Sequence, residues 1–230
     1  MELFTRTWGP PAAPAMVLLH GVTGDGGAWA EFAPRFADRW HVIAPDQRGH
    51  GRSRHAEAYS FDLFADDLHG LLDAYDIERA VLVGHSMGGV VAYRYAERHP
   101  ERVAAMVLEE APPPVPLGRE LGPRPAGELD YDWALRAPIL AELNDPGPDW
   151  PDRLATIAVP TLVVAGGERS HLPQADIATM AGFMPAARLV TIDAGHLVHE
   201  TRPDEFATAV KDFLDGHQQV NSRAVRGRLA

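Results

Sequence analysis

The chain of 230 residues contains no cysteine and only one lysine, Lys211. The absence of cysteine excludes disulfides, thiolate metal sites and a cysteine nucleophile, and it fits a reducing cytoplasm. Lys211 lies in a helical pattern near the C-terminus, away from every motif, so Schiff-base catalysis is not expected. We therefore expect any side-chain nucleophile to be an oxygen atom.

Long apolar runs and an excess of positive charge are also missing. No apolar segment approaches the ~20 residues of a membrane-spanning helix, and the N-terminal residues show no secretory signal. The net charge of −11 argues against nucleic-acid binding, because such binding needs basic patches that neutralise phosphates. We expect an acidic cytoplasmic protein, monomeric or homodimeric, whose partner is a small molecule.

Six short apolar runs alternate with segments of helical periodicity. Alternation of this kind predicts an α/β fold with a mainly parallel central sheet and helices on both faces. Residues 61–75 carry one apolar stripe at helical spacing, which predicts a helix there. The six predicted strands lie at residues 17–19, 42–44, 80–83, 103–108, 161–165 and 189–192.

The pattern breaks in a proline-rich segment, residues 112–156, which holds one possible helix near residues 131–143. We interpret it as a short lid inserted into a core of residues 1–111 and 157–215, although a plain surface connection is the alternative. Residues 216–230 contain three arginines and no acidic residue, and we expect a flexible tail.

The pentapeptide Gly84-His85-Ser86-Met87-Gly88 follows one predicted strand and precedes a helix-compatible stretch. This context is typical of a nucleophile elbow, in which a strained turn exposes the serine hydroxyl. The alternative is an ordinary Gly/Ser turn between a strand and a helix. A serine hydroxyl is a weak nucleophile, so catalysis would need a base and donors for the oxyanion.

Candidates for both roles are present. His196 follows the last apolar run, at the edge where open α/β sheets place their sites, and is the candidate base. The backbone N–H of Met87, directly after the serine, is one candidate oxyanion donor, and that of Val22, in the loop after the first strand, is the second.

Together these segments resemble the α/β-hydrolase family, in particular serine esterase-like or lipase-like members with a short lid. The resemblance runs from about Val17 to Leu214 and implies a nucleophile, acid and histidine in that order, with Ser86 and His196 as the outer two. The matching segments are His20-Gly21 and residues 44–53, 84–89, 99–103, 160–164 and 194–196.

The acid is where the chain departs from the family pattern. Arg169 occupies the position where members usually carry an aspartate, and a cation cannot stabilise the histidine imidazolium. Some members are similar in placing the acid at the end of the strand before the lid, which here ends in Glu109. We favour Glu109 as the acid, followed by Glu168 and then Glu110.

The sequence also allows predictions about the substrate pocket, metals and cofactors. A metal site at His196-Leu197-Val198-His199-Glu200 is not expected, because the His-Glu-x-x-His order is missing. We expect no cofactor. The residues expected to line the substrate pocket are His20, Gly21, Trp29, His85, Trp133, Ile139 and Leu197.

The resulting hypothesis is a cofactor-independent serine hydrolase. It would cleave a carboxylic ester, or a related lactone or thioester, of a small and largely apolar substrate through an acyl-enzyme on Ser86. A serine at the elbow argues against haloalkane dehalogenases and epoxide hydrolases, which carry an aspartate there. A carbon–carbon bond hydrolase, a perhydrolase-like enzyme and a noncatalytic ligand-binding protein of the same fold remain alternatives.

Overall fold

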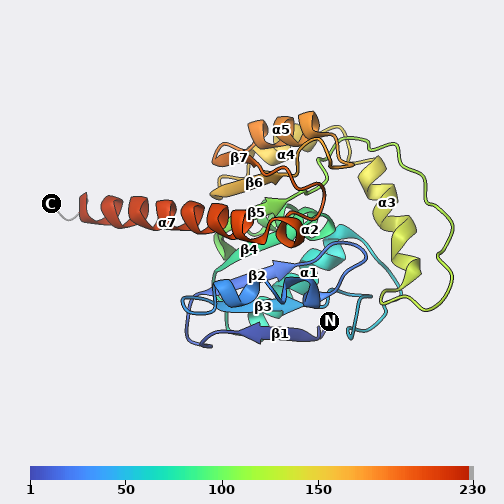
Figure 1. The fold of residues 1–230 in the computed structure, drawn as a ribbon, viewed down its shortest axis with the longest axis horizontal. Helices are drawn as coiled ribbons and strands as arrows, with labels where there is room; N and C mark the ends of the chain where they lie inside the picture. Colours follow the sequence, from blue (N-terminus) through green and yellow to red (C-terminus); the bar gives the residue numbers. More distant parts are fainter. Residues whose placement is uncertain (228–230) are drawn as a thin grey trace.

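A computed structural model describes the backbone of residues 1–227 and the side chains of residues 1–216. Its centre is one seven-stranded sheet with the order β1-β3-β2-β4-β5-β6-β7 (Figure 1). The strands are β1 (Thr5–Trp8), β2 (Ala15–Leu19), β3 (His41–Pro45), β4 (Ala80–His85), β5 (Val103–Glu109), β6 (Thr161–Ala165) and β7 (Ala187–Thr191).

The predicted mainly parallel sheet is confirmed. Strands β2 to β7 pair in parallel and coincide with the six predicted apolar runs. Strand β1 pairs antiparallel with β3 at the edge of the sheet and was not predicted. Its sequence, Thr-Arg-Thr-Trp, is mostly polar and half-buried, so it lacks the apolar run that marks the central strands.

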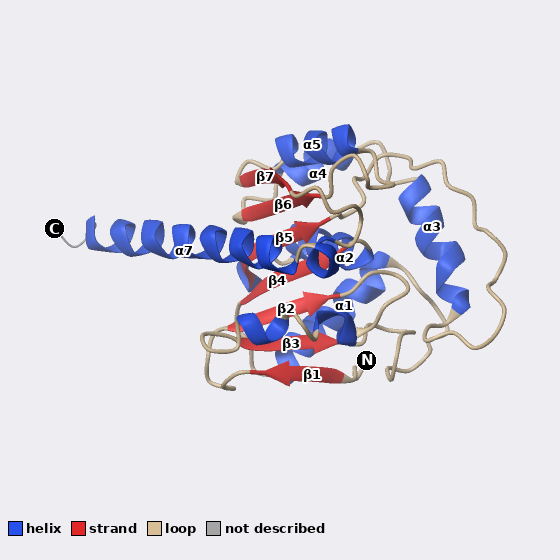
Figure 2. Ribbon diagram, in the orientation of Figure 1, coloured by secondary structure: helices blue, strands red, loops and turns tan. Residues whose placement is uncertain are grey.

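Helices cover both faces of the sheet (Figure 2). Side chains of α1, α2, α4 and α5 pack in one apolar core, and those of α7 in the core on the opposite face. Strand β2 serves both cores: Val17 and Leu19 join the first, and Met16 and Leu18 the second, because successive side chains point to opposite faces. The helices are α1 (Phe61–Ala74), α2 (Met87–Arg98), α3 (Arg136–Asn144), α4 (Trp150–Ala155), α5 (Gln174–Phe183), α6 (Val198–Thr201) and α7 (Pro203–Gly227).

Helix α1 confirms the prediction for residues 61–75. It begins after Ser60, whose side chain caps the helix by accepting a hydrogen bond from the Leu63 N–H. Phe61, Phe64 and Leu68 on the predicted stripe are buried. The helix therefore forms because its apolar face packs on the sheet and its first turn is capped.

The proline-rich segment joins β5 to β6 and contains α3 and α4. Helix α3 stands beyond the carboxyl ends of the parallel strands, on the side of the site (Figure 1). Two backbone bonds fasten the segment to the core: Gly51 N–H to the Asp130 oxygen at 2.7 Å, and Asp132 N–H to the Gly49 oxygen at 2.7 Å. Motion of this segment as a lid stays a prediction.

Helix α7 continues as backbone to Gly227 and projects past the sheet (Figure 2). The expected flexible tail, residues 216–230, thus begins within this helix. Its last three residues lie outside the described part of the chain, and the flexibility of the tail stays a prediction. Within residues 1–227, every helix is too short or too polar to cross a bilayer.

The first turn of α2 packs tightly on β2. A Cβ added to Gly88 would overlap the Leu19 carbonyl group, and one on Gly84 would overlap the Gly88 carbonyl group. Both obstacles are backbone, which cannot rotate aside as a flexible side chain can. Glycine is therefore required at both positions for the strand and the helix to meet.

We expect Gly88→Ala to destabilise the fold by about 1–3 kcal/mol, the usual cost of overpacking. Gly70→Ala is the matched control, because Gly70 lies in α1 with open space around its Cβ position. Removing this glycine should stabilise the protein by about 0.4–1 kcal/mol. Urea unfolding followed by circular dichroism measures both. Equal stability of the two variants would contradict the assigned contact.

Candidate active site

Ser86 lies at the turn between β4 and α2 with a φ of 51°. A positive φ is uncommon for a residue other than glycine and stores about 1–3 kcal/mol of strain. The Ser86 N–H donates to the Glu109 carbonyl oxygen at 2.9 Å, which fixes the turn to β5. The predicted strand-turn-helix context of an elbow is therefore present.

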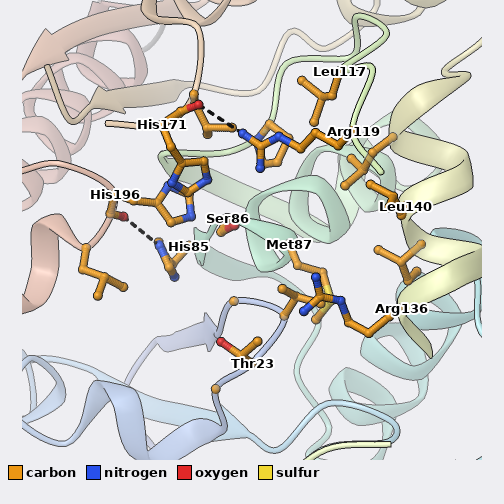
Figure 3. A pocket seen from close by; sticks show the side chains of 18 of the residues that line it. Thr23, His85, Ser86, Met87, Leu117, Arg119, Arg136, Leu140, His171 and His196 are labelled. Atoms are coloured by element: carbon orange, nitrogen blue, oxygen red, sulfur yellow. Dashed lines mark hydrogen bonds between the residues drawn. The ribbon is translucent and has the colours of Figure 1, made fainter. Parts of the chain in front are cut away.

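A cavity of about 680 Å³ opens in front of Ser86 (Figure 3). It lies between the loops after β2, β6 and β7, the elbow, and α3. The residues predicted for the site that line it are Gly21, Val22, His85, Ser86, Met87, Ile139, His196 and Leu197.

His20 does not line this cavity, contrary to the prediction. It is fully buried beneath the loop, where its Nε2 accepts the Gln47 N–H at 3.0 Å. The ring proton is then on Nδ1, which donates to the Gly21 carbonyl oxygen at 2.8 Å. Burial holds the pKa of His20 well below its usual value. His20 therefore anchors the loop as a neutral side chain.

Trp29 and Trp133 are also absent from the cavity wall, so the pocket prediction is corrected at both. Trp29 is fully buried and stacks on His199, with ring centroids 4.4 Å apart. Trp133 packs within the proline-rich segment, near Tyr131. Large aromatic side chains near a site are frequently part of the core, as Trp29 is, whereas Trp133 is half-buried and packs against the core.

The loop after β2 lies directly against Ser86. A Cβ added to Gly21 would be 3.4 Å from the Ser86 Cβ. Beneath the loop, His50 Nε2 lies 2.9 Å from the Val22 carbonyl oxygen. On the other side, Met87 is the first residue of α2, and the first N–H groups of a helix have no acceptor within it. Val22 and Met87 thus flank Ser86.

The side chain of His196 meets Glu110. The Glu110 Oε2 lies 3.1 Å from the His196 Nδ1, and the carboxylate is fully buried. Glu110 follows the last residue of β5 with a φ of 47°, and its N–H donates to the Val164 oxygen at 2.9 Å. This second strained residue aims its side chain toward the loop that carries His196.

Three further donors surround the Glu110 carboxylate, all from the loop after β6 or the start of α5. They are the Gly166 N–H at 2.5 Å, the Gln174 Nε2 at 3.2 Å and the Ser170 hydroxyl. Burial alone would raise the pKa of Glu110, but the hydrogen bonds from His196, Ser170 and Gly166 outweigh it and lower that pKa. Glu110 is therefore ionised at neutral pH.

Glu109, the acid favoured from the sequence, contacts a different histidine. Both of its carboxylate oxygens lie 2.8 Å from His199 Nδ1, and Oε1 also accepts the His199 N–H at 2.8 Å. Glu168, the second candidate, is exposed. The structure thus corrects the predicted pairing: Glu110, the third candidate, is the carboxylate that His196 meets.

Comparisons with known proteins identify the family to which this fold belongs. The family described as alpha/beta hydrolase fold matches residues 14–157. The chain belongs to this family.

Several proteins are similar to this α/β hydrolase over most of its length. A 2-hydroxymuconate semialdehyde hydrolase of Pseudomonas sp. (strain CF600) is 32% identical, covering 86% of each chain. An sn-1-specific diacylglycerol lipase, ABHD11 of Mus musculus, is 28% identical over 90% of this chain and 82% of its own length. The solved structure of Est816, described as an N-acyl homoserine lactone degrading enzyme, has 30% identity and a TM-score of 0.74 and covers 92% of this chain and 96% of its own.

His85 connects the two histidine–glutamate pairs of this hydrolase. Its Nε2 lies 2.9 Å from the His196 carbonyl oxygen, and its ring centroid lies 5.1 Å from that of His199. Burial lowers the pKa of His85 to about 4, so the ring is neutral and its N–H can donate to that carbonyl. His171 packs against the other side of His196, with ring centroids 4.1 Å apart.

The sequence interpretation did not find several of these residues. His199 was considered only as a metal ligand, and in the described part of the chain no group of three His, Asp or Glu side chains is arranged to hold a metal. Ser170 and Gln174 follow Arg169 in the same segment of the sequence. Because the prediction concerned the missing aspartate at position 169, it did not identify these two side chains as hydrogen-bond donors to Glu110. The cavity residues Arg119, Arg136 and His171 had no motif around them.

The buried Glu109–His199 pair generates a prediction about stability. Burial would lower the pKa of His199, but the charge of Glu109 and their hydrogen bond raise it. For Glu109, the charge and hydrogen bonds of His199 outweigh burial and lower the pKa. Both groups therefore favour their charged forms at pH 6, and breaking such a buried pair typically costs about 3–5 kcal/mol.

We expect Glu109→Gln to lose most of this stability at pH 6 and less at pH 9. A histidine whose pKa is raised in the folded state contributes its full stabilisation below its unfolded pKa of ~6.5, and loses it as the pH rises through the folded pKa. The stabilisation from the glutamate, whose pKa is lowered on folding, is fully present above its unfolded pKa of ~4.3. Urea unfolding of wild type and variant at both pH values measures the difference, with exposed Glu168→Gln as control. A loss of equal size at both pH values would contradict this account.

Proposed function

We propose that this chain hydrolyses a carboxylic ester or a related acyl bond through an acyl-enzyme on Ser86. The observation that carries the proposal is the 3.1 Å contact between the buried Glu110 carboxylate and the His196 ring, in a cavity that also exposes Ser86. A strained serine, a histidine held by an ionised acid and a cavity that admits a small molecule are the parts that acyl transfer requires.

In the proposed reaction, the Ser86 oxygen attacks the carbonyl carbon while its proton moves to His196 Nε2. Glu110 accepts the Nδ1–H bond and stabilises the imidazolium that forms, without taking the proton. The tetrahedral intermediate then expels the alcohol, which receives the proton from Nε2. Water next gives a proton to His196 and attacks the acyl group, and the return of that proton to Ser86 releases the carboxylic acid.

The backbone N–H groups of Met87 and Val22 are our proposed oxyanion donors. Met87 begins α2, so its amide carries the partial positive charge of a helix N-terminus. Val22 lies in the loop that packs against Ser86. Two such donors stabilise the negative charge that develops on the carbonyl oxygen, and each is worth roughly 10²–10³ in rate.

We also propose that residues 112–156 act as a lid and shape the substrate. Ile139, Leu140 and Leu143 of α3 line the cavity, which supports binding of an apolar part of the substrate beneath this helix. A small substrate fits a cavity of about 680 Å³. Its apolar portion would displace water from these side chains.

A serine-directed fluorophosphonate probe tests the nucleophile. We expect the wild-type protein to be labelled and to hydrolyse 4-nitrophenyl esters or lactones, and Ser86→Ala to lose both properties while its thermal unfolding stays close to wild type. The variant removes only the attacking oxygen. Labelling that persists in Ser86→Ala would contradict the assignment, and a folded, unlabelled wild type would favour the noncatalytic binding protein.

The identity of the acid is tested by comparing Glu110→Gln with Glu109→Gln. We expect Glu110→Gln to lower kcat by about 10³–10⁴, because an amide cannot stabilise the imidazolium. Glu109→Gln, assayed at a temperature where circular dichroism shows it folded, should keep kcat within about tenfold of wild type. Near-normal turnover of Glu110→Gln beside a large loss in Glu109→Gln would reverse the assignment.

A further inference from the structure

Two arginines line the same cavity as Ser86. Arg119 lies in the proline-rich segment and Arg136 is the first residue of α3, and both side chains are half-buried. Figure 3 shows both extending from the outer wall of the cavity toward its interior, where Ser86 lies. Two positively charged side chains of the proline-rich segment therefore line this cavity.

The charges of these arginines are not balanced by ion pairs within the described residues. Arg119 donates from Nη2 to the His171 carbonyl oxygen at 3.1 Å, and Arg136 lies 5.6 Å from the centre of the Trp133 ring. Neither contact neutralises a guanidinium. The chain has 32 acidic residues against 21 lysines and arginines, so carboxylates are abundant. Yet in the described part of the chain neither arginine forms an ion pair with a carboxylate.

Two glutamates also line the cavity but leave the arginines uncompensated. Glu120 and Glu200 are both exposed, and water screens exposed charges strongly. Glu200 Oε1 lies 3.7 Å from His199 Nε2 and so belongs to the histidine side. Arg119 and Arg136 thus keep free N–H donors facing the cavity.

We propose that the substrate carries an anionic group, a carboxylate or a phosphate, which Arg119 and Arg136 bind while the acyl bond lies at Ser86. The planar guanidinium fork matches these oxygen anions and donates two parallel hydrogen bonds to them. This inference rests on the proposed function and names its substrate class. The substrate then combines an apolar portion under α3 with a charged end, and the anionic group is unchanged by the hydrolysis.

Two pairs of esters, matched in size and differing in charge, test the proposal. One pair has the charge on the acyl part, the 4-nitrophenyl monoester of glutarate against 4-nitrophenyl 5-methylhexanoate. The other has it on the leaving group, 4-acetoxyphenylacetate against 4-isobutylphenyl acetate. In at least one pair we expect the wild type to have a kcat/KM at least tenfold higher for the charged member, and 1 M NaCl should reduce this preference.

The double variant Arg119→Gln/Arg136→Gln should lower the charged-to-neutral ratio of kcat/KM at least tenfold. Arg124→Gln is the matched control: Arg124 lies in the same segment, outside the cavity wall, and donates to the Pro125 and Gly127 oxygens. It should keep the wild-type ratio. Competition by glutarate and by inorganic phosphate against the preferred ester tells a carboxylate site from a phosphate site.

Equal rates for both members of both pairs would overturn the inference, as would a double variant with the wild-type ratio. If Ser86 is labelled and neutral esters are cleaved, such a result leaves the proposed hydrolase intact. If no ester is cleaved and Ser86 is unlabelled, the proposed function fails, and calorimetry with glutarate and phosphate decides on the anion site. If glutarate or phosphate binds to the wild type but not to the double variant, the anion site is supported. If neither ligand binds to the wild type, the anion site is ruled out.

Discussion

The close approach of α2 to β2 is the constraint on which the site depends. Because Gly88 brings its helix against the carbonyl group of Leu19, the chain must reverse sharply between β4 and α2, and Ser86 takes up the positive φ that this reversal demands. The same contact holds Ser86 beside the loop after β2. One packing requirement between backbones thus sets the position of the serine and of the amides that flank it.

The end of β5 supplies the second constraint, by directing two consecutive glutamates to two histidines. Glu109 is still part of the strand and meets His199, whereas Glu110 has left it with a positive φ and meets His196. The loop after β6 provides hydrogen-bond donors for the Glu110 carboxylate, the Gly166 N–H and the Ser170 hydroxyl. Arg169, at the position where the family pattern predicted an aspartate, pairs with Asp193, with Nε 3.2 Å from Oδ1.

Much of this arrangement was predictable from the sequence because it follows from local patterns. Six strands were marked by apolar runs, and Ser86 and His196 by where they stand relative to those runs. Which of the two glutamates, Glu109 or Glu110, meets His196 was not predictable from the sequence. It depends on the positive φ at Glu110, which is set by how the end of β5 packs against the surrounding loops. Arg119 and Arg136 lie in a proline-rich segment without a catalytic motif, and their approach to the cavity depends on how this segment folds over the core.

The charges around the cavity explain why arginines would be needed for an anionic substrate. Glu110 is ionised beside His196, and the protein as a whole carries a net charge of −11, so an approaching anion meets a repulsive field. Coulomb interactions fall with distance, so an anionic group bound directly by Arg119 and Arg136 would be stabilised by these adjacent charges. Arg119 and Arg136 would therefore attract the anionic end of a substrate, while Glu110 keeps its own hydrogen-bond donors, His196, Ser170 and Gly166. In the proposed reaction, the positive charge that His196 gains would thus still be stabilised by Glu110.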